Sequence, residues 1–292
     1  MQTALVTGAS TGIGQATAIR LAGLCHTVVA GVRNPDGADE LRAAIAASGA
    51  HNVEILRLDV DNDESVAVAV AAATQQFGPI DVLVNNAGVS GAGSIEQMPL
   101  DEFRRQMETN VFGLLRCTQA VLPSMRERRS GAIVNVGSLA GRFVRQSMGA
   151  YAATKHAVEA ITDALAQEVA PFGIRVAVVE PGVVRTAIWA KAAPPPARTD
   201  PAGDAYALAD AKTMAYFGRM LRDAIEPSVV ADVVAEAITA ETPKLRYPVG
   251  WDADTILAAR QRITDEEIVA MAALDLDAWK AAWADAFGFS LG

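Results

Sequence analysis

Short apolar runs alternate along the chain with longer segments whose apolar residues recur at helical spacing. The apolar runs are typical of buried strands and lie at 3–7, 27–31, 53–58, 80–84, 131–136 and 173–180. The helical patterns between them cover about 12–24, 37–48, 62–77, 99–129 (one long helix or two) and 149–170. This alternation predicts a parallel sheet with helices on both faces, and such sheets bind ligands outside the carboxyl ends of their strands.

The pattern changes after Thr186. Residues 192–203 are rich in proline, which blocks helix, so an irregular connection is expected there. Helical patterns follow at about 204–223 and 227–240, then an edge strand at 245–249 and a helical tail to about 287. Ten of the sixteen aromatic residues lie beyond Arg185. They either pack helices onto the sheet or contribute to an apolar lid, for which the candidates are Trp189, Tyr206, Met214, Tyr216 and Phe217.

Composition narrows the function classes. The 292 residues are 51% hydrophobic, which is ample for one large α/β domain. A net charge of −9 argues against nucleic-acid binding. No apolar run approaches the ~20 residues that span a bilayer, no signal-peptide pattern opens the chain, and the histidines show no metal spacing. Two cysteines without a pairing pattern suit a reducing compartment. We expect a soluble cytoplasmic protein with no nucleic-acid, membrane or metal partner.

The segment T-G-A-S-T-G-I-G at 7–14 follows the first strand and opens a helix. Glycines there permit a tight turn and a close approach of a pyrophosphate, which then lies at the helix N-terminus. The alternative is a tight strand–helix turn without a ligand. The candidate phosphate-binding residues are Gly8, Ser10, Thr11, Gly12, Ile13 and Gly14.

The end of the second strand, V-A-G-V-R-N, distinguishes the two nicotinamide dinucleotides. An acidic residue here would accept from a ribose 2′-hydroxyl and repel a 2′-phosphate, whereas an arginine would bind the phosphate. Val32 stands at the acidic position and is followed by Arg33 and Asn34. The pattern favours NADP(H) over NAD(H), unless Arg33 is only a solvated charge.

Asp59 and Val60 end the third strand, where a carboxylate could accept from an adenine amino group. The spacing of Asp59, Asp61 and Asp63 also suggests a calcium loop, but Glu64 replaces its glycine and Val70 its last acidic ligand. Asp61 to Glu64 is instead expected to form a capping box.

Two further motifs end strands. N-N-A-G at 85–88 offers small residues beside a cofactor (Asn86, Ala87 and Gly88) or is only a turn. P-G-V-V-R-T at 181–186 offers Pro181, Gly182, Val184 and Thr186, the last to a carboxamide.

Tyr151 and Lys155 are four residues apart, which places them on one face of a helix. A neighbouring ammonium would lower the tyrosine pKa from its ordinary value of about 10. The pair alone could be a solvated helix face. Asn110 lies inside a helical pattern, where an amide competes with backbone bonding, and either holds a water in a proton relay or is a surface amide.

In this order and spacing, the motifs T-G-x-x-x-G-I-G, N-N-A-G, Asn110, Ser138, Y-x-x-x-K and P-G-x-x-x-T resemble the non-extended branch of the short-chain dehydrogenase/reductase family. The resemblance covers about residues 1–186 and implies a Rossmann-type doubly wound sheet. Arg33 and the longer C-terminal part also resemble the hydroxysteroid/retinol dehydrogenase-like subgroup, while in the tail from about 263 we recognise no pattern.

The resemblance implies roles for individual residues. Tyr151 would be the general acid/base, and Ser138 would orient the substrate oxygen. Lys155 would bind the nicotinamide ribose and lower the Tyr151 pKa, and Asn110 would anchor a water. Hydride would pass between the nicotinamide and the substrate carbon without a metal.

The chain is therefore expected to be one domain: a cofactor-binding and catalytic core at 1–186, a substrate lid at 187–225 and an extension at 226–292. It is expected to oxidise or reduce an apolar secondary alcohol or ketone (steroid-, retinoid- or aryl-ketone-like) with NADP(H). The alternatives are an NAD(H) enzyme and a catalytically silent cofactor-binding protein. Family members form homodimers or homotetramers through the helices at about 99–129 and 149–170. Pocket walls are expected from Val89–Ala92, Leu139–Met148 and 187–225, with Arg142 and Arg145 at the rim or on an anionic substrate group.

Overall fold

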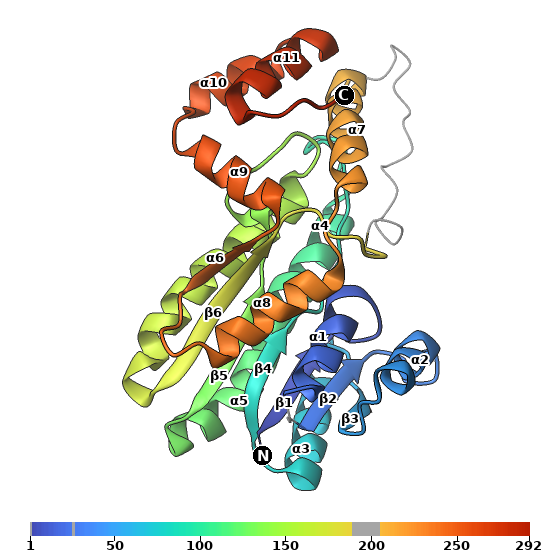
Figure 1. Ribbon diagram of the computed structural model, residues 1–292, viewed down its shortest axis with the longest axis vertical. Coiled ribbons are helices and arrows are strands. Elements are labelled where there is room, and N and C mark those ends of the chain that lie inside the picture. Colours follow the sequence, from blue (N-terminus) through green and yellow to red (C-terminus); the bar gives the residue numbers. More distant parts are fainter. Residues whose placement is uncertain (1, 25–26, 189–204) are drawn as a thin grey trace.

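A seven-stranded parallel sheet forms the centre of the computed structural model, which describes residues 2–24, 27–188 and 205–292 (Figure 1). The strand order is β3-β2-β1-β4-β5-β6-β7, and every neighbouring pair is parallel. All seven predicted strands are confirmed, with β7 at the edge. Their bounds are β1 Thr3–Thr7, β2 Thr27–Val32, β3 Val53–Arg57, β4 Ile80–Asn85, β5 Gly131–Val136, β6 Ile174–Pro181 and β7 Arg246–Val249.

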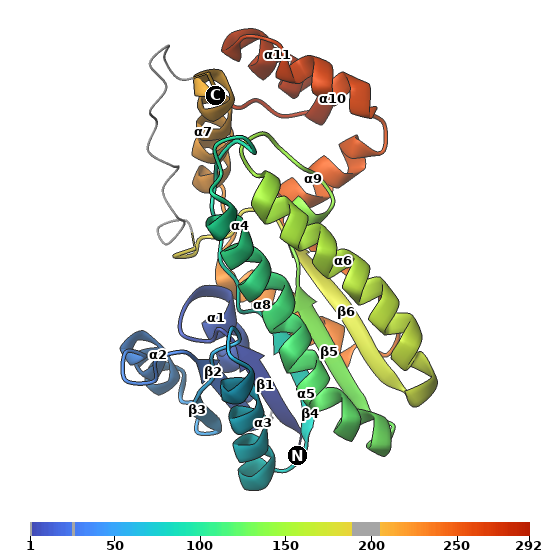
Figure 2. The same ribbon diagram turned by 180° about the vertical axis from the view of Figure 1, so that it is seen from behind.

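Helices cover both faces of the sheet. Successive side chains of a strand point to opposite faces, and here those on both faces are apolar and need to be buried. In β1, Ala4 and Val6 belong to one apolar cluster and Leu5 to the other. The first cluster packs against α1 (Gly12–Ala22), α2 (Asp39–Ser48) and α8 (Pro227–Thr239) (Figure 1). The second packs against α3 (Asp63–Phe77), α5 (Gly113–Arg128) and α6 (Gly149–Val169), which face the viewer in Figure 2. Runs such as Leu5-Val6 are apolar throughout because both faces are buried.

The helical pattern at 99–129 forms one interrupted column. It begins with α4 (Leu100–Met107), widens into a π-helical turn η1 (Glu108–Phe112) and continues as α5. Asn110 lies in the π-helical turn, which commonly marks a functional site. Two short 3₁₀ helices, η2 (Leu139–Gly141) and η3 (Ala170–Phe172), flank α6.

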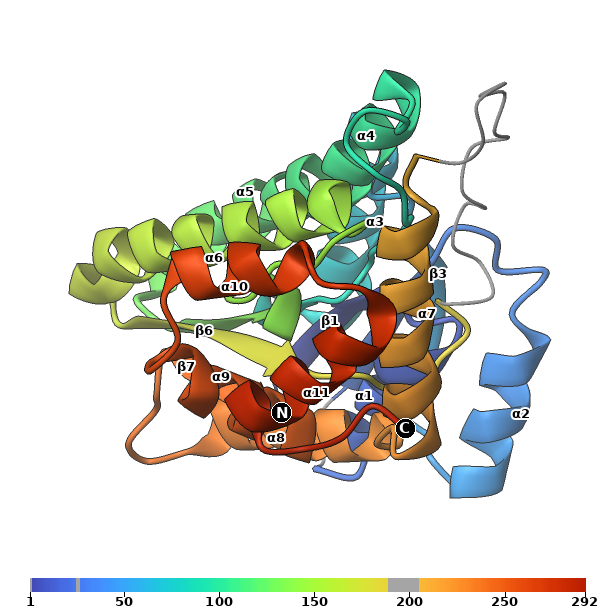
Figure 3. The same cartoon turned by 90° about the horizontal axis from the view of Figure 1, so that it is seen from above.

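The C-terminal helices build an apolar cluster of their own beyond the carboxyl ends of the strands. They are α7 (Ala207–Arg222), α9 (Trp251–Arg260), α10 (Asp265–Ala272) and α11 (Leu276–Phe287), and Figure 3 shows α10 and α11 over the sheet beside α7. Trp283 stacks on Phe287 with ring centroids 4.1 Å apart, and both contact Phe143 from the loop after β5. Most of the tail's aromatic residues therefore pack on one another. The simpler interpretation, that they pack helices onto the sheet, holds for Tyr247.

Two expectations concern residues outside the described ranges: the irregular connection at 192–203 and the place of Trp189. No helix within the described ranges is long and apolar enough to cross a membrane.

Candidate active site

A cavity of about 560 Å³ lies where the strands end and the chain turns into the helices. The order of the strands reverses between β1 and β4, which is the place where open sheets of this kind bind ligands. Of the predicted site residues, those lining the cavity are Gly8, Ser10, Thr11, Gly12, Ile13, Arg33, Asn34, Val60, Asn86, Ala87, Gly88, Ser138, Tyr151, Lys155, Pro181, Gly182, Val184 and Thr186. Gly14, Asp59 and Asn110 do not line it.

The loops after β1 and β4 are locked together. Thr7 Oγ1 accepts hydrogen bonds from the backbone N–H groups of Asn86 and Ala87, both at 3.0 Å. Asn86 Nδ2 donates to the carbonyls of Thr7 and Gly8 at 2.9 and 3.1 Å. Gly8 has φ +66°, and a Cβ there would lie 2.8 Å from Ala87 Cα. N-N-A-G is therefore more than a turn: it holds the glycine segment in place beside the cavity.

The N-terminus of α1 opens toward the same cavity. Thr11 precedes the helix in extended conformation, and its side chain makes no capping hydrogen bond, so the first backbone N–H groups are not capped by it. Together with the helix dipole they suit an anion such as a pyrophosphate. Gly12 has φ +61° and lies against Thr186, since a Cβ there would be 3.1 Å from the Thr186 methyl group.

Gly14 was predicted to contact a cofactor, but it packs between protein atoms. A Cβ at this position would lie 2.4 Å from both Asn86 Nδ2 and the Gly8 carbonyl oxygen. The glycine therefore allows α1 to approach the glycine segment closely and has no surface on the cavity.

Asp61, and not Asp59, reaches the cavity after β3. The Asp59 carboxylate accepts from the Asp61 N–H at 3.2 Å and so stabilises its own turn. Asp61 accepts from the Thr109 hydroxyl at 2.9 Å, while its Oδ1 is buried without a hydrogen-bond partner in the described part of the chain, and burial raises the pKa of this carboxyl. The predicted capping box is wrong as well: Asn62 caps α3 by accepting from the Ser65 N–H at 2.8 Å.

Arg33 is exposed, lines the cavity and forms no ion pair with any residue of the described ranges. Many arginines of the described ranges pair with a carboxylate, as Arg20 does with Asp232 at 2.5 Å. Its guanidinium is thus available to a ligand.

Ser138, Tyr151 and Lys155 meet at the base of α6. Burial raises the pKa of Tyr151 to about 12, and a hydrogen bond with Ser138 opposes this shift. Burial lowers the pKa of Lys155 to about 8, and the charge of Glu159 opposes that. Lys155 Nζ donates to the Val136 carbonyl at 2.8 Å and lies 5.7 Å from the centre of the Tyr151 ring. The expected lowering of the Tyr151 pKa is not found, because burial outweighs the hydrogen bond with Ser138.

Asn110 is a buried tether. Its Oδ1 accepts from the Val89 N–H at 2.8 Å, and its Nδ2 donates to the Val89 carbonyl at 2.9 Å and to Thr154 Oγ1 at 3.0 Å. The Thr154 hydroxyl donates in turn to the Tyr151 carbonyl at 2.7 Å. Asn110 therefore fixes the loop after β4 to the helix that carries Tyr151, and it is not a surface amide. Its role in holding a water stays a prediction.

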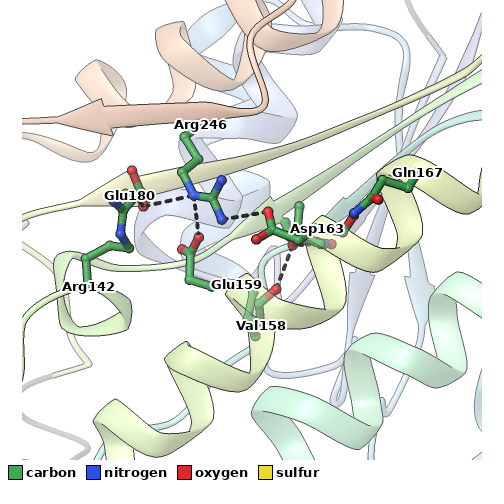
Figure 4. Close-up of polar contacts among 9 residues, drawn as sticks. Arg142, Val158, Glu159, Asp163, Gln167, Glu180 and Arg246 are labelled. Carbon is green, nitrogen blue, oxygen red and sulfur yellow. Dashed lines mark hydrogen bonds and ion pairs between the residues drawn. The ribbon is translucent and has the colours of Figure 1, made fainter. Parts of the chain in front are cut away.

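A charged cluster around Arg246, which the sequence did not predict, joins α6 to β6 and β7 (Figure 4). Arg246 Nε donates to Glu159 at 3.0 Å and its Nη2 to Asp163 at 2.6 Å. Glu180 is fully buried, lies 3.9 Å from Arg246 Nε and accepts from Arg142 at 3.0 Å. Burial and the negative charge of Glu180 raise the pKa of Glu159 to about 7. The available signal was the spacing of Glu159, four residues after Lys155.

The other end of the cavity is mainly apolar. Tyr216 and Phe217 line it, as expected for lid residues, together with Leu139, Phe143, Arg145 and Met148. Met214 is instead 70% exposed, and the Tyr206 hydroxyl donates to Glu96; neither lines the cavity. Val89 contributes to the wall, but Ala92 does not. Arg142 is engaged with Glu180 and does not line the cavity, so only Arg145 remains of the two predicted rim arginines.

Comparisons with known proteins identify the family of the chain. Residues 2–196 match the short chain dehydrogenase family. The chain is 37% identical to an uncharacterized oxidoreductase of Bacillus subtilis, YusZ, over 249 residues, which are 85% of this chain and 88% of that one.

Solved structures give the same result. A short-chain dehydrogenase from Streptomyces avermitilis superposes with a TM-score of 0.77 at 36% identity, over 92% of this chain and 97% of that one. A metagenomic short-chain oxidoreductase in complex with NADP superposes with a TM-score of 0.66 at 27% identity, over 85% and 96%. The names of these three relatives do not mention the hydroxysteroid/retinol dehydrogenase-like subgroup, so membership of that subgroup stays a prediction. The chain therefore belongs to the short-chain dehydrogenase/reductase family of NAD(P)-dependent oxidoreductases.

Proposed function

We propose that the protein transfers a hydride between NADP(H) and a secondary alcohol or ketone with an apolar body, using Tyr151 as general acid/base. The observation that carries this proposal is the convergence of Ser138, Tyr151 and Lys155 on one cavity with the glycine segment of 8–13. A cofactor-binding protein without activity would have no need of that convergence.

The residues present fit a nicotinamide dinucleotide. Gly8 allows the glycine segment to pack closely against Ala87, and the N-terminus of α1, which Thr11 does not cap, offers N–H donors to a pyrophosphate. Pro181, Gly182, Val184 and Thr186 would hold the nicotinamide end, and Lys155 the adjoining ribose. The cofactor supplies the hydride chemistry, and the protein contributes position and electrostatics.

NADP(H) is favoured over NAD(H) by the end of β2. Arg33 is exposed and unpaired in the described ranges, and Val32 replaces the carboxylate that would repel a 2′-phosphate. The related metagenomic oxidoreductase was crystallised with NADP.

The proton transfer follows from the state of Tyr151. With a pKa of about 12 its phenol is protonated near neutral pH and can donate to the oxygen of a ketone, which Ser138 orients. In the reverse direction the phenol must release its proton, and the positive charge of Lys155 favours that step. Asn110 maintains the geometry through Thr154, and a water near it would return the proton to solvent.

Homodimer or homotetramer formation through α5 and α6 is also proposed, following the family. Size-exclusion chromatography with light scattering measures it directly, and a monomer at micromolar concentration would contradict it.

Tyr151→Phe tests the proposal. It removes the ionisable hydroxyl group and keeps the ring, so we expect the kcat for any active ketone to fall by about 10³-fold or more, because the general acid is lost. The Kd for NADPH, measured by fluorescence titration, should change less than about threefold. A Tyr151→Phe variant with near-wild-type turnover would disprove the mechanism.

Arg33→Ala tests the cofactor preference. Loss of a charge-assisted contact to the 2′-phosphate should raise the Kd for NADPH by about 10- to 100-fold while leaving the Kd for NADH unchanged. Equal effects on both cofactors, or none, would favour the NAD(H) alternative.

A further inference from the structure

Arg145 is the one charged side chain among the residues that line the apolar end of the cavity in the described structure. It lies in the loop between η2 and α6, six residues before Tyr151. Its neighbours on the wall are Met148, Tyr216 and Phe217. A guanidinium in such surroundings requires a physical explanation, since transfer of a charge from water into an apolar site is costly unless the charge is paired.

Two aromatic side chains lie against the guanidinium. Arg145 Cζ lies 3.5 Å from the centre of the Tyr216 ring and 4.6 Å from that of Phe217. Because the two ring planes are 85° apart, the guanidinium can stack flat on only one of them, and cation–π attraction does not replace hydrogen-bond acceptors for its five N–H donors. Within the described ranges, none of these donors has a hydrogen-bond acceptor and no carboxylate lies within 4.0 Å of them.

Nearby arginines differ in this respect. Arg142 pairs with Glu180 at 3.0 Å, and Arg246 pairs with Glu159 and Asp163. The acidic group that acts on Arg145 is Asp252, but only at longer range, and its carboxylate already accepts the Val183 N–H at 2.8 Å. Tyr216 gives no counter-charge, because burial raises the pKa of its phenol to about 12. Burial lowers the pKa of the Arg145 guanidinium, and the influences of Tyr216 and Asp252 oppose this shift.

We propose that Arg145 binds an anionic group of the substrate, a carboxylate, while Tyr151 and Ser138 act on a carbonyl or hydroxyl elsewhere in the same molecule. The substrate class is then an apolar keto acid or hydroxy acid whose carboxylate is separated from the reacting carbon by an apolar segment. A planar carboxylate matches the edge of a guanidinium with two parallel hydrogen bonds. This inference rests on the proposed function and adds the identity of the second recognition point.

A purely structural role for Arg145 is the competing explanation, in which the guanidinium only supports Tyr216 and Phe217. The two explanations differ in a measurable way. A structural support affects charged and neutral substrates equally, whereas an anion-binding residue affects only the charged ones.

Matched pairs of aryl keto acids and their methyl esters separate these outcomes. We would measure kcat and KM with NADPH for 4-oxo-4-phenylbutanoate, 5-oxo-5-phenylpentanoate and their esters, in the wild type and in Arg145→Met and Arg145→Lys. The wild type should prefer at least one acid over its ester by about 10- to 100-fold in kcat/KM, as expected for charge-assisted hydrogen bonds. Arg145→Met should abolish that preference mainly through KM, and Arg145→Lys should restore part of it.

Arg219→Met is the matched control. It also removes one arginine charge, but Arg219 lies in α7 and does not line the cavity. It should leave the acid-to-ester ratio within about twofold. The inference is overturned if the wild type shows no preference for any acid, or if Arg145→Met changes acids and esters alike.

A binding measurement decides the inference independently of turnover. In the presence of saturating NADPH, the unreactive 4-phenylbutanoate should raise the melting temperature of the wild type but not of Arg145→Met, and 4-phenylbutanamide should raise neither. If the carboxylate stabilises only the wild type while no ketone is turned over, Arg145 is an anion site and the proposed function is wrong. If neutral ketones are reduced and the carboxylate has no effect, the proposed function stands and the role of Arg145 is structural.

Discussion

Glu159→Gln is expected to remove a loss of stability that the wild-type protein suffers as the pH rises through neutrality. Glu159 Oε2 accepts from Arg246 at 3.0 Å, but its Oε1 is buried without a hydrogen-bond partner among the residues described. The fully buried Glu180 lies 3.9 Å from the same Arg246 nitrogen. Two buried carboxylates, Glu159 and Glu180, therefore lie near one nitrogen of a guanidinium that also pairs with Asp163. A glutamine keeps an oxygen for Arg246 and cannot ionise, so it removes the repulsion without opening a cavity.

The magnitude follows from the pKa of Glu159, which is about 7 in the folded protein against 4.5 for an ordinary glutamate. The folded state thus holds this proton more tightly than the unfolded chain. Its contribution to stability is fully present below about pH 4.5 and is lost as the pH rises through about 7. At about 1.4 kcal/mol per pKa unit, the upper limit is about 3 kcal/mol. Asp163 and Arg246 are 43% and 29% exposed, so water screens the charges and we expect about 1–2 kcal/mol.

The assay is urea denaturation followed by tryptophan fluorescence at about pH 5, 7 and 8.5. The free energy of unfolding of Glu159→Gln minus that of the wild type should increase by about 1–2 kcal/mol between the lowest and the highest pH. The corresponding difference in melting temperature should increase by about 2–8 °C. Glu168→Gln, an exposed carboxylate on the same helix, is the control and should show a constant difference. A difference between Glu159→Gln and the wild type that is equal at all three pH values would refute the reasoning.

Two other predictions concern close packing and the tether. Gly14→Ala should lower the free energy of unfolding by about 1–3 kcal/mol and weaken NADPH binding, because its Cβ would lie 2.4 Å from Asn86 and from Gly8. Gly218→Ala, with no atom within 4 Å, serves as the control and should be neutral or slightly stabilising by the same urea denaturation. Asn110→Ala should cost about 2–3 kcal/mol, since it leaves Val89 N–H and carbonyl groups without their partner, and it should lower kcat more than it changes the Kd for NADPH. Unchanged stability and kcat in Asn110→Ala would show that the tether is dispensable.

Local sequence determined the strands, most helices and the loops that form the cavity. Period and apolar content identify a buried strand without knowledge of its neighbours, and a parallel sheet brings all carboxyl ends to one edge. The glycine segment, N-N-A-G, Ser138 and the Tyr151–Lys155 pair were therefore expected together, and the structure places them around one cavity. Local sequence did not predict the direction of each side chain: Asp61 reaches the cavity where Asp59 was expected.

Only the tertiary structure decided the charges around the site. The residues of the charged cluster around Arg246 come from α6, β6, β7 and the loop before α6, so no local pattern could bring Glu159, Glu180 and Arg246 together. The same holds for Arg142 and Arg145, which are three residues apart: one pairs with Glu180 and the other lies unpaired against Tyr216. Protonation depends on burial and on distant neighbours, and for this reason Tyr151 has a raised pKa where its sequence neighbour Lys155 suggested a lowered one. The sequence by itself determined where the chemistry takes place, and long-range packing decided which charges remain for a substrate.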